Sequence, residues 1–194
     1  DVPTAIDEVM LYKQNGGISL VDATSIGIAR DPVGLARISR ATGVHVIMGA
    51  SYYVAEAHPS EVECSDEGQL VDRIVRDVTE GVDDTGIRSG IIGEVGCSWP
   101  LHDNERKVLR ASARAQRLTG SPILIHPGRD ETSPLEIIEV LAEAGANLSR
   151  TIMGHLDRTV FQHDTLQKIA EAGCFMEWDL FGREESYYSA NPKI

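Results

Sequence analysis

The sequence predicts an α/β fold in which parallel strands alternate with helices. Short apolar runs alternate with amphipathic segments, about one pair every 25 to 35 residues, as βα repeats do. The runs are apolar throughout, which is typical of strands covered on both faces. Three runs are each followed by a side chain that can bind a metal: Glu94, His126 and His155. Together these observations favour a parallel sheet with functional residues at one rim.

Six helices are predicted from N-caps, prolines in a first turn and glycines after a last turn. Thr4 is the expected N-cap of the first helix, and Asn15-Gly16-Gly17 ends it. Ser133-Pro134-Leu135-Glu136 has the pattern of a capping box, in which a serine and a glutamate satisfy free amides at a helix start. In order, the helices are expected over residues 4–15, 31–43, 65–81, 103–120, 134–144 and 164–173.

Strands are predicted where β-branched and apolar residues gather in short runs between these helices. They are expected over residues 18–24, 44–48, 89–92, 122–125, 151–153 and 174–180. The connection over residues 51–65 is the longest, and it includes Tyr53. Because long loops in compact domains often line active sites, we expect this loop to form a wall or lid of the site.

Two parallel architectures fit these elements: an open doubly wound sheet, and part of a (β/α)8 TIM barrel. No GxGxxG or GxxxxGK[ST] motif follows a predicted strand, so the best support for a nucleotide-binding open sheet is missing. Metal-binding residues on successive strand ends favour the barrel. A complete barrel takes about 250 residues and eight strands. We therefore expect residues 1–194 to form a single, incomplete barrel domain with about six strands, which reaches Pro192-Lys193-Ile194 without a further unit.

The metal-binding side chains are expected to meet, because the carboxyl ends of neighbouring parallel strands converge on one rim. One carboxylate and two imidazoles suit a divalent transition metal, and zinc binds both ligand types. No HxxxH or CxxC spacing holds the ligands in one short segment. The residues alone therefore leave two readings open for Glu94, His126 and His155: metal ligands, or capping and ion-pairing residues of the rim.

The charge balance limits the partners that this chain can bind. It has 30 Asp and Glu against 18 Lys and Arg, a formal net charge of −12, which argues against nucleic acids and anionic membranes. No apolar run approaches the roughly 20 residues that span a bilayer, and no leader is evident. Three cysteines without a spacing pattern indicate reduced thiols: Cys64, Cys97 and Cys174. We therefore expect a cytoplasmic protein that acts on a small molecule.

Four sequence blocks, in this order along the chain, carry a recognisable pattern: Gly93-Glu94-Val95-Gly96-Cys97-Ser98-Trp99-Pro100-Leu101, His126-Pro127-Gly128-Arg129, His155-Leu156-Asp157-Arg158-Thr159 and Asp179-Leu180-Phe181-Gly182. The chain resembles, over essentially its whole length, the phosphotriesterase family of the amidohydrolase superfamily, and most of all its phosphotriesterase-related branch. The resemblance implies a distorted (β/α)8 barrel with two divalent metal ions, usually zinc, bridged by a carboxylate and a hydroxide. By position, Glu94 would be the bridging carboxylate, and His126 and His155 would bind the more exposed metal.

Two elements of the family pattern are absent from the sequence. The family has a His-x-His pair on its first strand for the buried metal, and an Asp on its last strand that binds metal and moves the proton. Neither has a counterpart here. Two readings follow: a fragment of a complete hydrolase, or a chain that has lost half of its metal site.

The resemblance implies a zinc-dependent hydrolase, in which a metal-activated hydroxide attacks an ester, a lactone or a small amide. N-acyl amino acids and N-acyl amino-sulfonates are the candidate substrates. Tyr53 matches an aromatic substrate-wall position, and Arg129 and Arg158, each three residues after a metal-ligand position, would clamp an anionic group. The alternative roles are structural: packing in the loop for Tyr53, and ion pairing for Arg129 and Arg158.

Supporting residues and partners complete the expectations. Asp157 is expected to orient a ligand or Arg158, and Asp179 is a weaker candidate for such a role. The alternative to a hydrolase is a catalytically inactive metal- or ligand-binding remnant of the barrel. Because unpaired strand edges invite pairing, the chain could also form a homodimer.

Overall fold

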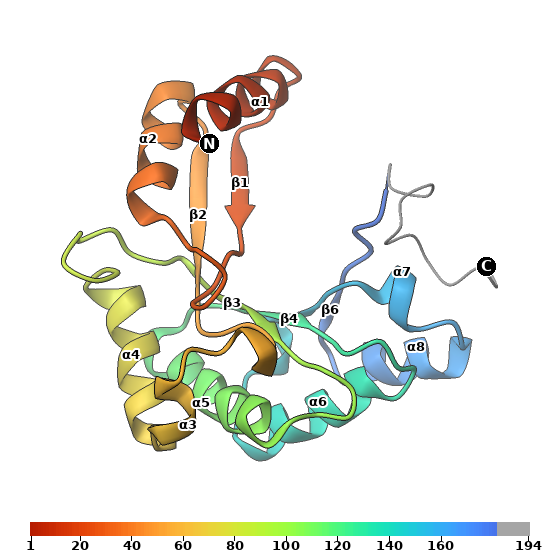
Figure 1. The fold of residues 1–194 in the computed structure, drawn as a ribbon. Helices are drawn as coiled ribbons and strands as arrows, with labels where there is room; N and C mark the ends of the chain where they lie inside the picture. Colours follow the sequence, from red (N-terminus) through yellow and green to blue (C-terminus); the bar gives the residue numbers. More distant parts are fainter. Residues whose placement is uncertain (182–194) are drawn as a thin grey trace.

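The computed structural model describes residues 1–181 of the chain. All neighbouring strands pair in parallel, in the order β1-β2-β3-β4-β5-β6, and the sheet curves as the wall of a barrel does (Figure 1). The strands are Ser19–Asp22 (β1), His45–Ala50 (β2), Ile91–Gly96 (β3), Ile123–His126 (β4), Thr151–Met153 (β5) and Phe175–Met176 (β6). The predicted α/β fold with about six parallel strands is confirmed as a half-barrel.

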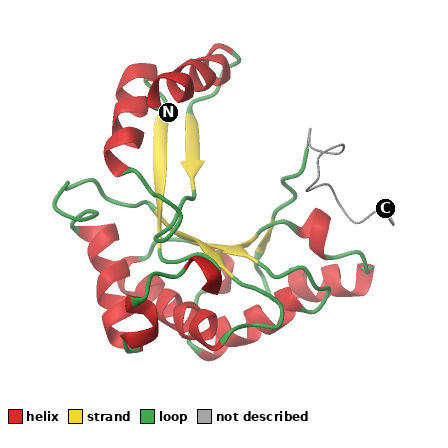
Figure 2. Cartoon of the chain, viewed as in Figure 1, coloured by secondary structure: helices red, strands yellow, loops and turns green. Residues whose placement is uncertain are grey.

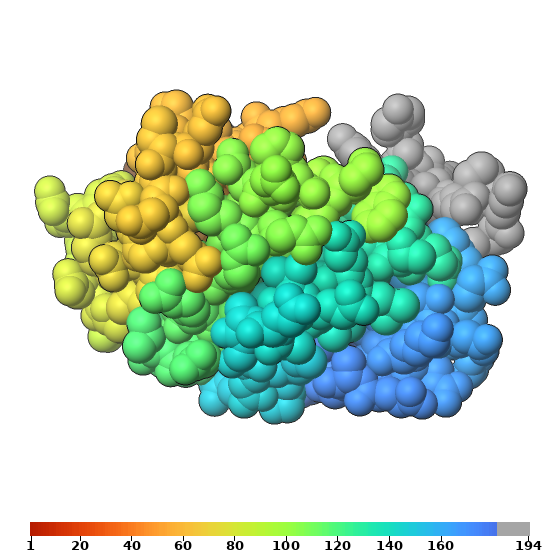
Figure 3. All heavy atoms as spheres, turned by 90° about the horizontal axis from the view of Figure 1, so that it is seen from below, coloured from red at the N-terminus to blue at the C-terminus, as the bar shows by residue number. Residues whose placement is uncertain are grey.

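Most of the helices lie on the outer side of this curved sheet (Figure 2). The helices are Val2–Gln14 (α1), Pro32–Thr42 (α2), Glu61–Cys64 (α3), Glu67–Thr79 (α4), Asp103–Thr119 (α5), Ser133–Glu143 (α6), Leu156–Thr159 (α7) and His163–Glu171 (α8), with single 3-10 turns at Ala55–Ala57 and Leu148–Arg150. From below, the segments that form this outer face follow one another in chain order, from yellow to blue (Figure 3). No helix within residues 1–181 is long and apolar enough to cross a membrane.

The core lies between the sheet and the helices that cover it. Its largest fully buried side chains are Tyr52, Leu70, Ile74, Ile92, Leu109, Ile123, Ile125, Ile137, Leu141, Met153, Leu156 and Ile169. At the two edges of the sheet, apolar side chains remain open to solvent: Val21 in β1 is 45% exposed and Phe175 in β6 is 63% exposed. The expectation of strands covered on both faces is therefore wrong at these edge positions.

One buried ion pair fastens the loop after β1 to the helical layer. Arg30 and Asp77 of α4 are 2.8 Å apart, and their side chains are 4% and 0% exposed. Arg30 also donates to the carbonyl of Gly49 in β2, at 3.0 Å. The contact holds the segment between β1 and α2 against the body of the sheet.

Several predicted helix starts are wrong. The first helix begins at Val2, with Asp1 rather than Thr4 at the N-cap, because Pro3 favours the first turn. No capping box forms at Ser133, because Ser133 is the buried first residue of α6. The N-cap of this helix is Thr132, whose side chain makes no capping hydrogen bond. A capping box forms instead at Asp66, where α4 begins.

Two further segments differ from the prediction. The 51–65 connection is not a plain loop, since it contains a 3-10 turn and α3. The sixth strand is much shorter than 174–180, because only Phe175–Met176 pairs with β5. Gly182 of the last sequence block and the expected end of the fold at residues 192–194 lie outside the described residues.

Candidate metal centre

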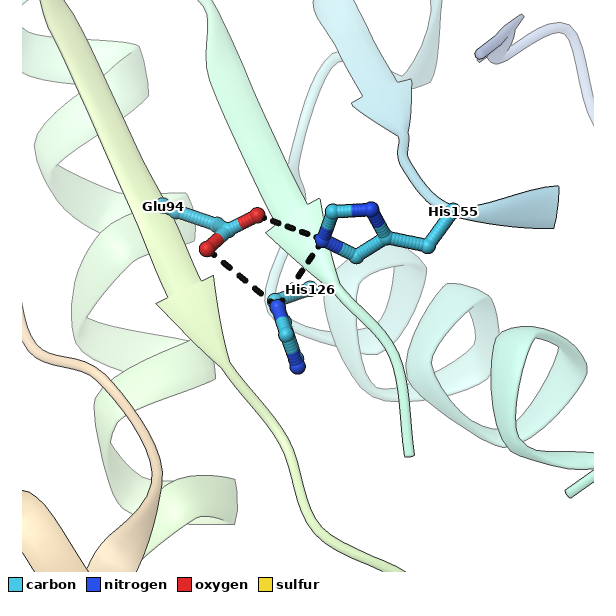
Figure 4. Close-up of side chains that lie close together, drawn as sticks. All are labelled: Glu94, His126 and His155. Carbon is cyan, nitrogen blue, oxygen red and sulfur yellow. Dashed lines mark hydrogen bonds and ion pairs between the residues drawn. The ribbon is translucent and has the colours of Figure 1, made fainter. Parts of the chain in front are cut away.

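Glu94, His126 and His155 converge at the carboxyl ends of β3, β4 and β5 (Figure 4). Nε2 of His155 lies 2.7 Å from Oε1 of Glu94 and 2.9 Å from Nδ1 of His126. Nδ1 of His126 lies 3.2 Å from Oε2 of Glu94. Their side chains are 17% to 18% exposed, so the cluster is largely shielded but open on one side.

Parallel pairing brings the three residues together. Gly96 in β3 is in register with His126, the last residue of β4. The amide of Gly154 donates to the carbonyl of Ile125 at 3.0 Å, which places the end of β5 beside β4. His155 then turns out of the strand with φ 56°, a left-handed conformation that is uncommon for residues other than glycine and often marks functional sites.

The three clustered side chains are better suited to binding a metal ion than to hydrogen bonding with one another. Arg158 lies 3.1 Å from Nε2 of His126, and because a guanidinium only donates, Nε2 must accept. The proton of neutral His126 is then on Nδ1. This proton and the Nε2 proton of His155 both point toward the Glu94 carboxylate and crowd each other there. A cation held by the three lone pairs removes this conflict. Tetrahedral zinc ligands lie about 3.3 Å apart, so a small outward adjustment is enough.

The charges in the cluster follow from these contacts. Burial raises the pKa of Glu94, but the hydrogen bonds and charges of His126 and His155 outweigh it and bring the pKa to about 2. Burial lowers the pKa of His155, but its contacts with Asp179 and Glu94 outweigh burial and raise the pKa to about 9. Burial is the main reason that the pKa of His126 is lowered. Without a metal, the cluster therefore holds a carboxylate, a neutral imidazole and an imidazolium.

A pocket of about 350 Å³ opens over the cluster. Its lining residues are Tyr53, Glu94, His126, Arg129, His155, Arg158, Asp179 and Leu180. The structure therefore places all three predicted substrate-binding residues beside the three predicted ligands. Burial lowers the pKa of Arg158, and the nearby charge of Arg129 lowers it further. Within residues 1–181, no acidic side chain forms an ion pair with either arginine.

Tyr53 reaches the cluster from the segment after β2. Its hydroxyl lies 3.2 Å from both ring nitrogens of His126, and the two rings meet edge to face at 4.9 Å. Gly96 makes this approach possible, because a Cβ at that position would lie 2.2 Å from the amide nitrogen of Val54. The expectation that this segment forms a wall of the site agrees with its position.

Sequence reasoning missed Glu105, which holds two rim segments together. This fully buried carboxylate in α5 accepts from the amides of Ala55, Ser98 and His102 and from the Ser98 hydroxyl, at 2.8 to 3.0 Å. The available signal was the spacing of His102 and Glu105, which form a capping box at the start of α5. Nearby, burial raises the pKa of the Cys97 thiol, consistent with an inert buried cysteine.

A family model described as the phosphotriesterase family matches residues 1–194. The chain belongs to this family. The match confirms the resemblance seen in the sequence blocks. Among family relatives, it is 47% identical to human N-acetyltaurine hydrolase over 188 residues, and 49% identical to the phosphotriesterase-related protein of Nematostella vectensis over 186 residues. The alignments cover 97% and 96% of this chain but 54% and 53% of the relatives, so the chain spans about half the length of the curated relatives that it matches.

A solved family structure has the same architecture. The phosphotriesterase homology protein of Escherichia coli, crystallised with phosphate in its active site, superposes with a TM-score of 0.90 at 27% identity. The superposition covers 97% of this chain and 64% of that chain. The six strands therefore correspond to part of a phosphotriesterase-family fold.

Proposed function

We propose that this chain carries the metal-binding half-barrel of a hydrolase, with Glu94, His126 and His155 as ligands of a divalent metal, for which zinc is the best match. The observation that carries the proposal is the convergence of these three donors in a pocket that also contains Arg129 and Arg158. When bound, the metal supplies Lewis acidity, which polarises a scissile carbonyl and lowers the pKa of the attacking water. Glu94 has a second oxygen, and it is the candidate bridge to the second metal that the family resemblance implies.

The two arginines favour a substrate with an anionic group. Within residues 1–181 the two guanidinium groups form no ion pair with an acidic side chain, and they provide a site for a carboxylate or a sulfonate beside the metal ligands. Small N-acyl amino acids and N-acyl amino-sulfonates combine such a group with a scissile amide. The name of the human relative supports the second class. In this proposal Tyr53 forms the wall against which the acyl part rests.

Metal binding also has a consequence for Arg158. Nε2 of His126 faces Arg158 at 3.1 Å. If His126 were to hold the metal through Nδ1, its ring proton would lie on Nε2, and two donors would face each other. Arg158 would then be free to bind the anionic group of the substrate, which would couple metal binding to substrate binding.

The test measures zinc content and hydrolysis of N-acetyltaurine by the native protein and by His126→Ala. We expect the native protein to bind zinc and cleave the amide, and the variant to lose both. Asp31→Ala is the matched control, because it removes the N-cap of α2, which does not line the pocket. Zinc binding without hydrolysis of any N-acyl substrate would favour the inactive remnant, whereas hydrolysis that survives His126→Ala would contradict the site.

The homodimer and the cytoplasmic location remain proposals. Within residues 1–181, β1 and β6 are the edge strands of the sheet, and these edges are the surfaces on which a second copy would pair. Light scattering on the purified protein across a range of concentrations tests this directly. A constant monomer mass would remove the homodimer.

A further inference from the structure

We propose that Asp157 and Asp179 act together as a brace that fixes the ring of His155, an inference that rests on the proposed metal site. Nδ1 of His155 lies 2.5 Å from Oδ2 of Asp179. Oδ2 of Asp157 accepts from the amide of Leu180, the residue after Asp179, at 2.7 Å. Asp157 thus holds the backbone that carries Asp179, and Asp179 holds His155. Neither aspartate is among the three clustered donors.

The contacts join the short helix α7, which contains Asp157, to the segment after β6. β6 ends at Met176, the amide of Glu177 still donates to the carbonyl of Met153 in β5 at 3.0 Å, and residues 178–181 continue outside any strand (Figure 1). The amide of Leu156 donates to the carbonyl of Glu177 at 3.1 Å, which adds a third connection between the same segments. A segment held by a few specific bonds moves when one of them is lost. The position of Asp179 therefore depends on Asp157.

His155 needs such support for two reasons. Its backbone is in the left-handed region, which persists only where surrounding contacts impose it. Its ring must also direct Nε2, and not Nδ1, toward Glu94 and His126. The Asp179 carboxylate selects that orientation through its ion pair with Nδ1, since the second nitrogen of a metal-binding imidazole is usually fixed by such a partner. The side chains of His155 and Asp179 are 18% and 27% exposed, so solvent competes only in part.

The arrangement assigns different roles to the two aspartates. Asp179 supports the ligand directly. Asp157 was expected to orient a ligand or Arg158, but its hydrogen bond goes to the Leu180 amide, so it acts on the ligand through the backbone. Both are positioning residues. The proposal predicts that the effect of Asp157 on the metal depends on its oxygen acceptor alone.

The experiment measures the zinc dissociation constant of the native protein by competition with a chromophoric chelator. Loss of a supporting partner of this kind costs about 10- to 100-fold in metal affinity. We expect Asp179→Ala to weaken zinc binding by about this factor, and Asp157→Ala to weaken it in the same direction, by about tenfold. Asp157→Asn keeps an oxygen acceptor for the Leu180 amide and should restore affinity to near the native value. Asp31→Ala removes an equivalent carboxylate-to-amide bond, to Gly34, and should leave affinity unchanged.

A second measurement keeps the proposal testable if the alanine variants fold poorly. Hydrogen exchange of the Leu180 amide in the unsubstituted protein should be slow, and it should be faster in Asp157→Ala and slow again in Asp157→Asn. Native zinc affinity in a folded Asp157→Ala, or equal losses in Asp157→Ala and Asp157→Asn, would overturn the brace. A native protein that binds no zinc but protects the Leu180 amide would instead overturn the proposed function.

Discussion

Glu94 and His155 are 61 positions apart in the sequence, yet Oε1 of Glu94 lies 2.7 Å from Nε2 of His155. Parallel strand order makes this contact possible, because β3, β4 and β5 are neighbours and their carboxyl ends face the same rim. The contact joins Glu94, a residue of β3, to His155, which lies in the turn after β5. Its geometry therefore depends on the strand pairing and on the conformation of the turn at His155.

Arg158 should strengthen the binding of a small sulfonate to the zinc-loaded protein. We expect methanesulfonate to bind the zinc-loaded native protein at least about tenfold more tightly than it binds zinc-loaded Arg158→Met. The reason is that a charge-assisted hydrogen bond contributes about 1.5 to 3 kcal/mol. Calorimetric titration measures both constants. Arg110→Met is the control, since Arg110 pairs with Glu67 outside the pocket. An Arg158→Met variant that binds the sulfonate as the native protein does would contradict the proposed anion site.

Asp77→Ala should strongly destabilise the fold. The substitution leaves Arg30 buried without its partner, which costs about 3 to 5 kcal/mol in the free energy of unfolding. Chemical denaturation measures the loss. Asp83→Ala is the matched control. Asp83 pairs with Arg73, which also lies 3.2 Å from Asp77, but Asp83 is 67% exposed, so its loss should change stability by less than about 1 kcal/mol. Similar losses in the two variants would argue against burial as the cause.

Glu105→Gln should loosen the rim while leaving the helix in place. A glutamine amide keeps one oxygen but places an NH2 group against a backbone donor, such as the Ala55 amide at 2.8 Å. We expect a loss of about 1 to 3 kcal/mol in the free energy of unfolding. Hydrogen exchange at Ala55 and Ser98 should accelerate more than at the centre of α5. Uniform acceleration along the chain would mean that Glu105 supports the core rather than the rim.

Stability should fall below about pH 6.5 partly because of His58. Burial lowers the pKa of His58, whose Nε2 donates to the carbonyl of Tyr53 at 2.8 Å. A histidine whose folded-state pKa lies below its unfolded value binds protons more readily when unfolded, so acid favours unfolding. Denaturation midpoints at pH 7 and pH 5.5 should therefore differ more in the native protein than in His58→Gln. Equal differences would show that other groups account for the acid sensitivity.

The sheet and the cluster were predictable because both depend on local pattern and topology. A run such as 122–125 followed by His126 places that imidazole at a strand end whatever lies elsewhere in the chain. Parallel order then brings it next to Glu94. The helix ends were less predictable: a capping box formed at Asp66 and not at Ser133, because the start of α6 is set by a buried serine and a neighbouring proline.

The supporting contacts could not be predicted from local pattern. Glu105 reads as a surface residue at the start of a helix, and its burial comes from rim segments 50 and 7 positions away. The sixth predicted strand ended early for a related reason. Residues 177–181 are positioned by specific hydrogen bonds to β5 and to the segment around α7, and sequence periodicity does not report such bonds.

Gly96 determines how closely the Tyr53 segment can approach β3. Its amide donates to the carbonyl of Tyr52 at 3.1 Å, and no carbon atom fits between the two backbones. Any larger residue at this position would push Tyr53 outward and widen the pocket above His126, with every metal ligand intact. If the pocket binds acyl groups as we propose, the range that it accepts is adjustable at a position that has no side chain of its own.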